Sequence, residues 1–255
     1  MARHPGIVIK ALTWNLFHGR AHPPAGLDRP LFDEFAALLE RAEWDIALLQ
    51  EAPPRWFQQL GERLAAHGAI ALTSRNFGAA LRGRIADRKP DLIKSNEGGS
   101  NQLFVRPPWR IAETRRLTLA RFPERRRALW VRLGRDDGGL GLTLVNLHAS
   151  ANRPRAAARE LLHAAAWADE TPLIFGGDLN LRPAEDPATY GELEQRFALG
   201  PPTGPTAIDH LLARGLELVE APRRLTAEQR MVDLADGRRI SLSDHAPVAA
   251  RFAMR

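Results

Sequence analysis

Residues 173–181 read LIFGGDLNL, an apolar run that ends in two glycines and two short polar side chains, Asp178 and Asn180. The run has the length and composition of a buried strand. Asp178 and Asn180 are two residues apart across a tight turn, so both side chains can reach one cavity. We expect Asp178 to orient or deprotonate a water and Asn180 to donate its amide hydrogens to a developing phosphorane oxygen. An Asx turn is the alternative interpretation.

Polar side chains end five other apolar runs in the same way. These clusters are Asn15 in LTWNLFHG, Gln50 and Glu51 in IALLQEAP, His148 in LVNLHAS, Asp209 in AIDHLL, and Asp244 and His245 in LSDHAPV. Strand ends in layered α/β domains collect catalytic groups, because the sheet holds them in place while the loops stay open to solvent. The pattern therefore predicts one active site assembled from distant segments.

The order of apolar runs predicts an α/β fold with two packed sheets. Strand-like runs are Ile7–Trp14, Ile46–Leu49, Ala69–Thr73, Gln102–Val105, Leu129–Leu133, Leu142–Leu147, Leu173–Phe175, Ala207–Leu212 and Val248–Phe252, and helical periodicity covers Leu31–Ala42, Pro54–His67 and Arg153–Ala168. Strands dominate the middle of the chain, which favours sheets packed on each other with helices outside over one doubly wound sheet. The segments 74–100 and 182–206 are expected to be loops that determine substrate choice.

Length and composition favour a single domain. The chain has 255 residues, and 44% of them are hydrophobic, which is enough for one large core. No linker divides the chain, so we expect one catalytic domain over residues 1–255. There is no cysteine, which excludes disulfides and thiolate metal sites.

The sequence contains no recognisable membrane or export signal. Only MARHPG precedes the first apolar run, and no stretch approaches the ~18–20 apolar residues that a transmembrane helix needs. We therefore expect a cytoplasmic protein without a transmembrane segment. Protein partners are not predicted.

Positive charge is concentrated in the middle of the chain. The formal net charge is +6, and residues 75–132 alone hold 15 Lys or Arg against 5 Asp or Glu. Such a segment suits a polyanion whose phosphates are neutralised by basic side chains, which points to nucleic acid. A solvated basic face is the equally weighted alternative.

The acids favour a hard cation. Glu51 is expected at a strand end, with Asn15 and Asp244 as oxygen-bearing neighbours, and the chain lacks cysteine and an H-E-x-x-H pattern. This ligand chemistry favours Mg²⁺ or Mn²⁺ over zinc. A calcium loop beginning at Asp178 is excluded, because Pro183 stands where that loop requires glycine. Taken alone, Glu51 is also compatible with a solvated loop acid.

Two histidines are candidates for contact with a phosphate. His245 follows Asp244 and can pair with Asp209, an arrangement that orients an imidazole and stabilises its protonated form. His148 ends its own apolar run, where a buried structural histidine is the alternative. His210 is set aside, because alternation along a strand points it away from Asp209.

Taken together, the clusters LTWN, LLQE, VNLH, GGDLN, IDHLL and SDH resemble the endonuclease/exonuclease/phosphatase superfamily. This group contains pancreatic-type deoxyribonucleases, apurinic-site endonucleases, neutral sphingomyelinases and inositol-phosphate phosphatases. The resemblance spans about residues 10–252, and GGDLN with a terminal SDH is its most specific part. It implies a four-layer α/β sandwich, with two packed, mainly antiparallel or mixed sheets flanked by helices.

The resemblance also implies residue roles in phosphoester hydrolysis by metal-assisted in-line attack of water. Glu51 would be the principal metal ligand, with Asn15 beside it and Asp244 completing or orienting the metal shell. Asp178 would position the water, Asn180 would hold the transition state, and His245, oriented by Asp209, would contact the phosphate. His148 would contact it from another side as a possible general acid, and Asn101 in GGSNQLFVR would be a weaker phosphate contact.

One subclass is disfavoured by two departures from its motifs. Apurinic-site endonucleases typically have a lysine soon after the QE motif and a tyrosine where this chain has His148. The LHAS motif is closer to the deoxyribonuclease-like and sphingomyelinase-like branches.

Three functions remain open at this stage. A divalent-metal-dependent phosphodiesterase acting on DNA or RNA leads, because the motif set is complete and the 75–132 segment is basic. The alternatives are a sphingomyelinase-like or inositol-phosphate or other small phosphoester hydrolase, and a non-catalytic binding protein on the same scaffold. Serine-hydrolase and nucleotide-loop motifs do not occur.

Overall fold

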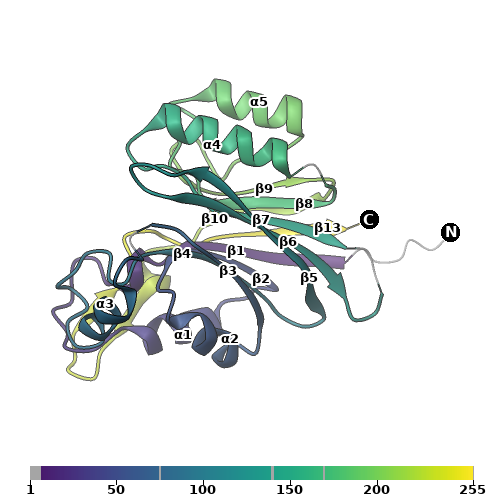
Figure 1. Ribbon diagram of the computed structural model, residues 1–255. Coiled ribbons are helices and arrows are strands. Elements are labelled where there is room, and N and C mark those ends of the chain that lie inside the picture. The colour runs from purple at the N-terminus through teal and green to yellow at the C-terminus, as the bar shows by residue number, and fades with distance from the viewer. Residues whose placement is uncertain (1–6, 75, 139–140, 169, 255) are drawn as a thin grey trace.

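The computed structural model describes residues 7–74, 76–138, 141–168 and 170–254. Its strands form two large sheets (Figure 1). In the order of pairing, the first sheet contains β10 (Glu217–Arg224), β13 (Val248–Met254), β1 (Ile7–Asn15), β2 (Ile46–Ala52), β4 (Ser100–Val105) and β3 (His67–Leu72). The second contains β5 (Trp109–Ala120), β6 (Arg126–Arg135), β7 (Leu142–His148), β8 (Leu173–Asp178) and β9 (Asp209–Arg214).

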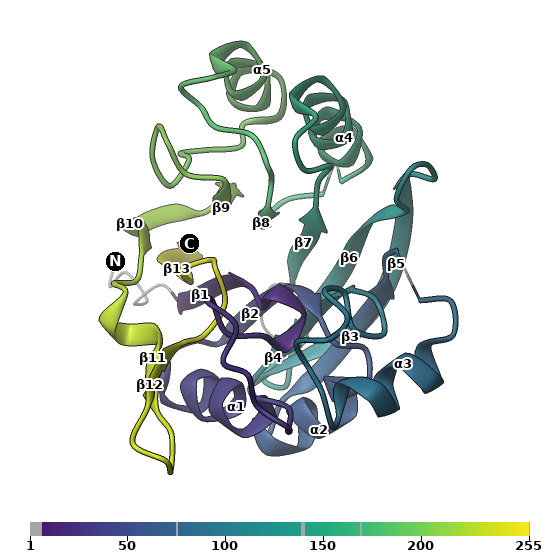
Figure 2. The same cartoon turned by 90° about the vertical axis from the view of Figure 1, so that its left-hand side faces the viewer.

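Helices cover the outer faces of both sheets (Figures 1 and 2). On the first sheet lie α1 (Phe32–Arg41) and α2 (Trp56–Arg63), with α3 (Ala79–Ala86) further along the same side, and on the second lie α4 (Pro154–Trp167) and α5 (Pro187–Phe197). A small hairpin pairs β11 (Met231–Asp233) with β12 (Arg239–Ser241), and short 3-10 turns occur at Phe17–Gly19 and Glu228–Arg230. The expected four-layer sandwich is thus confirmed.

Three apolar clusters hold the layers together. One lies between the sheets and includes Leu48 and Ile174, a second joins the first sheet to α1 and α2 around Phe35, and a third joins the second sheet to α4 and α5 around Phe175. Every residue of β7 and β8 is buried, because these strands are covered on both faces. This double burial explains why their sequences are nearly continuous apolar runs rather than alternating ones.

Strand register brings the polar ends of the runs together. The two parallel pairs are β1 with β2, which sets Asn15 beside Gln50, and β7 with β8, which sets His148 beside Asp178. Strand β9 runs antiparallel to β8 and sets Asp209 beside Asp178 on its other side. In each sheet, polar side chains therefore lie side by side at the ends of neighbouring strands.

Several elements were not expected from the sequence, among them α3, α5, β5 and β10. Helices α3 and α5 lie within the segments expected as loops, 74–100 and 182–206, and strands β5 and β10 were not recognised. Asp186 caps α5 by accepting a hydrogen bond from the Thr189 backbone, and Pro187 follows at the first helical position, a start signal that was overlooked. Strands β5 and β10 have few buried side chains, so their apolar pattern is weak.

The paired glycines of GGDLN are required by the neighbouring strands. A Cβ atom on Gly176 would lie 2.5 Å from the His210 carbonyl oxygen, and one on Gly177 would lie 2.0 Å from the Leu147 carbonyl oxygen. Gly177 also has a φ of +133°, which side-chain-bearing residues rarely adopt. The close approach of β7 and β9 to β8 thus depends on these two residues.

Replacing Gly177 by Ala is therefore expected to lower the free energy of unfolding by about 3 kcal/mol or more, through steric overlap and backbone strain. Gly191→Ala is the matched control, since Gly191 lies inside α5 with no atom within 4 Å of a new Cβ. That change should stabilise the protein by about 0.5–1 kcal/mol. Urea titration measures both values, and equal midpoints for the two variants would contradict the proposed packing.

None of the helices in the described ranges combines the length and the apolar character needed to cross a bilayer. The MARHPG segment, on which the expectation about export depends, lies outside the described residues.

Candidate active site

The site is assembled from the ends of both sheets. Asn15 and Glu51 come from β1 and β2, and His148, Asp178 and Asp209 come from β7, β8 and β9. Asp244 and His245 lie in the loop that precedes β13.

Side chains of the motifs hold that loop against the first sheet. The Trp14 indole donates a hydrogen bond to the His245 carbonyl at 3.0 Å. The Ser243 hydroxyl donates to the Asn15 carbonyl at 2.7 Å and accepts from the His245 backbone at 3.0 Å. Trp14 and Ser243 thus place His245 next to the end of β1.

Two polar motif residues have a structural position rather than a catalytic one. The Gln50 side-chain nitrogen donates to Asn146 Oδ1 at 2.8 Å, and the Asn146 nitrogen donates to the Leu49 and Gln102 carbonyls. Both side chains are fully buried between the sheets. Because buried polar groups need partners, this network fixes how the sheets meet below the site.

Asp178 is at the centre of the site. One of its oxygens, Oδ2, accepts a hydrogen bond from Asn15 Nδ2 at 2.9 Å and lies 3.4 Å from His148 Nε2 and 3.8 Å from His245 Nε2. The other oxygen accepts from the Asn180 backbone at 3.1 Å. Burial and the charge of Asp209 raise the pKa of Asp178 to about 6. Asp178 is therefore a stronger base than an exposed aspartate.

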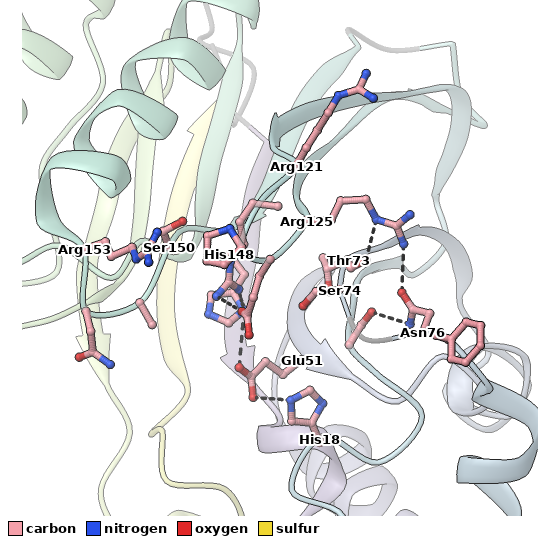
Figure 3. Close-up of a pocket in the computed structure, with 17 residues that line it drawn as sticks. His18, Glu51, Thr73, Ser74, Asn76, Arg121, Arg125, His148, Ser150 and Arg153 are labelled. Carbon is pink, nitrogen blue, oxygen red and sulfur yellow. Dashed lines mark hydrogen bonds and ion pairs between the residues drawn. The ribbon is translucent and has the colours of Figure 1, made fainter.

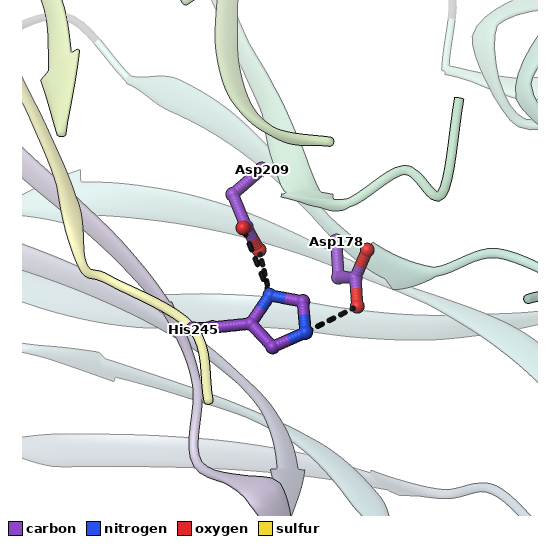
Figure 4. A group of neighbouring side chains, drawn as sticks. All are labelled: Asp178, Asp209 and His245. Carbon is purple, nitrogen blue, oxygen red and sulfur yellow. Dashed lines mark hydrogen bonds and ion pairs between the residues drawn. The ribbon is translucent and has the colours of Figure 1, made fainter. Parts of the chain in front are cut away.

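Asp209 and His245 form a hydrogen-bonded pair (Figure 4). His245 Nδ1 lies 2.9 and 3.1 Å from the two Asp209 oxygens. Burial opposes the charged imidazole, but the hydrogen bond and charge of Asp209, with the charges of Asp178 and Asp244, outweigh it and raise the pKa of His245 to about 10. His245 is thus a cation at neutral pH.

Asp178, Asp209 and His245 also have the spacing of a metal-ligand group, with one potential ligand atom of each within 4.8 Å of the others. A protonated imidazole has no lone pair to offer, because ligation requires the neutral form. Ligation would therefore require His245 to lose the proton that its hydrogen bond to Asp209 stabilises.

His148 is held in one tautomer by an arginine. Its Nδ1 lies 3.0 Å from Nη1 of the buried Arg126, which also donates to Glu124. A guanidinium can only donate, so Nδ1 accepts and the ring proton is on Nε2, which faces Asp178. Burial and the charge of Arg126 lower the pKa of His148 well below its usual value. His148 is therefore neutral.

Glu51 lies between two histidines. Its oxygens are 3.3 Å from His18 Nε2 and 3.7 Å from His148 Nδ1 (Figure 3). Burial and the charge of Asp178 raise the pKa of Glu51 to about 7. Glu51 and Asn180 both have positive φ values, 47° and 48°, and such strained residues concentrate at functional sites.

A cavity of about 1060 Å³ opens above Glu51 and His148 (Figure 3). Other parts of its wall come from the segment after β3, the β5–β6 turn and the start of α4. Arginines line it, namely Arg121, Arg125, Arg126 and Arg153. Gly99 also lines it, and a Cβ there would lie 3.0 Å from the Thr73 hydroxyl. The cavity is thus acidic at Glu51 and basic around its walls.

The remaining expected residues are placed as follows. Asn180 follows β8, and its side chain donates to the Ala149 carbonyl at 3.1 Å. Asp244 is exposed, with one oxygen 3.9 Å from His245 Nε2. Asn101 on β4 is fully buried and donates to the Arg127 carbonyl at 2.7 Å. Of the expected residues, only Glu51 and His148 line the described cavity, and phosphate contact by Asn101 stays a prediction.

Sequence reasoning missed His18 and Arg126. His18 stands within the LTWNLFHG cluster, and its closeness to Asn15 was the available signal. Arg126 belongs to the run Arg125-Arg126-Arg127, which indicated charge but not which guanidinium turns inward.

The donor set fits a hard divalent cation at Glu51. The charges of Asp178 and Asp244 both raise the pKa of Glu51, so three carboxylates share a region where a cation would relieve their repulsion. Asn15 Oδ1 accepts from the Phe17 backbone at 2.9 Å and keeps a second lone pair. Oxygen donors of this kind suit Mg²⁺ or Mn²⁺.

Known proteins share this architecture. A family model described as Endonuclease/Exonuclease/phosphatase family matches residues 12–245. A family protein from Bacteroides thetaiotaomicron superposes with a TM-score of 0.72 at 16% identity, covering 99% of this chain and 100% of that one. A mannosyl-6-phosphatase from the same species gives 0.68 at 15%, covering 96% and 99%. The human Nocturnin catalytic domain with bound sulfate gives 0.65 at 17%, covering 97% and 94%.

These structural likenesses establish the fold alone, because the sequence identities are too low to carry a function over to this chain. A search of curated protein sequences finds no match to this chain. The family model spans most of the chain, from β1 to His245, and includes every residue placed at the site above. The chain therefore belongs to the endonuclease/exonuclease/phosphatase family and is a phosphoester hydrolase.

Proposed function

We propose that this protein is a divalent-metal-dependent phosphodiesterase that cleaves nucleic acid. The observation that carries the proposal is the cavity with Glu51 and His148 at its base and four arginines around it. Phosphates are the groups that such a combination of acidic and basic side chains would hold and hydrolyse.

We assign the metal to Glu51, with Asn15 and Asp244 as further oxygen donors. A bound Mg²⁺ or Mn²⁺ would supply positive charge that offsets the charge developing on the phosphoryl oxygens. Glu51 lies between two histidines but is only half-buried, so its carboxylate is accessible from the cavity.

Asp178 is the group that orients the attacking water and accepts its proton. Its raised pKa supports this role, since a base with a pKa nearer neutrality transfers protons more effectively. The neutral His148 can donate from Nε2 to a phosphoryl oxygen, which this geometry favours over general-acid catalysis by an imidazolium. The His245 cation stabilises negative charge, and Asn180 has a second amide hydrogen available for the phosphate.

Nucleic acid is favoured as the substrate because of the basic wall. Arg121 and Arg153 are exposed on different parts of the cavity wall (Figure 3), where they can neutralise phosphates that flank the reacting one. A substrate with a single phosphate would leave this extended positive surface without a role.

Purified protein with Mg²⁺ or Mn²⁺ is expected to cleave DNA or RNA at low salt and to be inactive in EDTA. On single strands, the logarithm of the observed affinity should fall with the logarithm of salt by about 0.7 for each phosphate that is neutralised. Gel analysis of labelled duplex DNA, single-stranded DNA and RNA measures cleavage. Glu51→Gln should abolish the metal-dependent rate.

The same panel should include sphingomyelin vesicles, inositol phosphates and a sugar phosphate. Turnover of one of these, without cleavage of any nucleic acid, would replace the proposed substrate by a lipid or small phosphoester.

A further inference from the structure

Two phenylalanines at the cavity mouth are exposed to solvent. Phe77 is 96% exposed and lines the cavity, and Phe122 is 88% exposed and lies between Arg121 and Pro123, which also line it. They are the two most exposed large apolar side chains in the described ranges. An isolated exposed apolar residue needs no explanation, but two exposed rings on the segments that form the wall of one reactive cavity do.

Phe77 follows a residue that is anchored at several points. Asn76 Oδ1 accepts from Arg125 Nη2 at 3.1 Å, and its amide donates to the Gly99 carbonyl at 3.3 Å (Figure 3). Arg125 Nε also donates to the Thr73 carbonyl at 2.7 Å. The segment that carries Phe77 is thus tied to the β5–β6 turn, and the ring is held near the opening without being packed into the core.

Phe122 lies in the turn that joins β5 to β6. This turn carries Arg121 before the ring and Arg125 after it, and both arginines line the cavity. Aromatic rings set among arginines are the combination that binds single-stranded nucleic acid, where bases stack on the rings and phosphates meet the guanidinium groups.

We propose that Phe77 and Phe122 form a stacking subsite for unpaired bases next to the phosphate that is cleaved, so that the preferred substrate is single-stranded nucleic acid or an unpaired end. This inference rests on the proposed function and specifies its substrate. Duplex bases are already stacked on one another, so only an unpaired base offers its face to a ring.

The cavity favours a nucleotide over a lipid surface. Its volume of about 1060 Å³ is slightly above the range for pockets that enclose whole small ligands, about 300–1000 Å³. A base and its phosphate belong to the same nucleotide, so they can occupy one cavity together. Phe77 lines the same cavity as Glu51 and His148, so a base stacked on its ring and the attached phosphate would share one cavity.

The test measures binding separately from cleavage. Fluorescence anisotropy in EDTA compares a labelled oligothymidylate with an abasic chain of equal length and charge. The unaltered protein should bind the oligothymidylate about 5-fold more tightly than the abasic chain, or better, since loss of one base–ring stacking contact lowers affinity by about this factor. The double variant Phe77→Leu/Phe122→Leu should lose that preference and keep its affinity for the abasic chain within about twofold.

Leucine keeps the apolar character and removes the aromatic face, so the variant separates stacking from insertion into lipid. Leu218→Ala/Val219→Ala on the edge strand β10 is the matched control, because both residues are exposed and neither lines the cavity. An unchanged base preference in the phenylalanine variant would overturn the inference. So would binding to phosphatidylcholine–phosphatidylserine vesicles without any base preference.

The two proposals fail in different ways. If the protein binds bases through the phenylalanines but cleaves no nucleic acid with Mg²⁺ or Mn²⁺, the proposed function is wrong, and only the binding of unpaired bases by the two rings stands. If it cleaves nucleic acid and the phenylalanine variant shows the same base preference, the subsite is wrong and the proposed function stands.

Discussion

Asp178→Asn is expected to lower kcat at least ~100-fold on whichever phosphoester the protein hydrolyses, with the fold intact. The Asp178 carboxylate accepts hydrogen bonds from the Asn15 side chain and the Asn180 backbone. It also faces His148 and His245, so it contacts site residues that come from both sheets. An amide cannot accept the proton of the attacking water. Steady-state kinetics with saturating substrate measure the loss.

The same substitution should not destabilise the protein. Because burial and the charge of Asp209 raise the pKa of Asp178 to about 6, the ionised carboxylate is disfavoured in the folded state at higher pH. A neutral amide removes that cost, so the free energy of unfolding at pH 8 is expected to stay equal or to rise. Asp186→Asn is the matched control, since asparagine also caps a helix. Full activity in Asp178→Asn would remove the central assignment.

Asp209→Asn is expected to change the pH dependence of the reaction and not only its rate. Asp209 keeps His245 protonated, with a pKa of about 10, so in the unaltered protein the cation is present below that pH and is lost as pH rises through it. Without the carboxylate, burial lowers the pKa of His245, and the cation is lost at much lower pH. We expect kcat/KM to fall at least ~100-fold at pH 8 and less at pH 6.

A profile of kcat/KM from pH 5 to pH 10 tests this shift, with the His245 ring proton followed by NMR. If the variant gave a profile lowered by the same factor at every pH, His245 would not act as a cation that Asp209 maintains. Asp186→Asn again controls for loss of a carboxylate elsewhere.

Much of the fold could be predicted from the sequence because its central strands are buried on both faces. The runs that become β1, β2, β7, β8 and β13 were recognised, and the two-sheet architecture with outer helices is confirmed. Strands β5 and β10 and helices α3 and α5 were missed, because exposed strands carry little apolar pattern and short helices are marked mainly by their caps.

Candidate site residues could be predicted because catalytic groups follow strand ends, where the apolar run stops. The glycines of GGDLN belong to the same local signal, and the structure gives their reason in the close approach of Leu147 and His210 backbones. The role of each polar residue could not be predicted from its local sequence. Gln50 stands beside Glu51 in the sequence, yet it joins the sheets while Glu51 faces the cavity.

Most of the buried strands, the family and the residue types that gather at the strand ends could be predicted from the sequence, because these depend on patterns within a few residues. Long-range packing, by contrast, places Arg126 where it keeps His148 neutral, Asp209 where it keeps His245 charged, and Phe77 beside the same cavity. Contacts such as Asn15 with Asp178 join residues 163 positions apart. They depend on strand order, register and sheet packing, which no local pattern specifies.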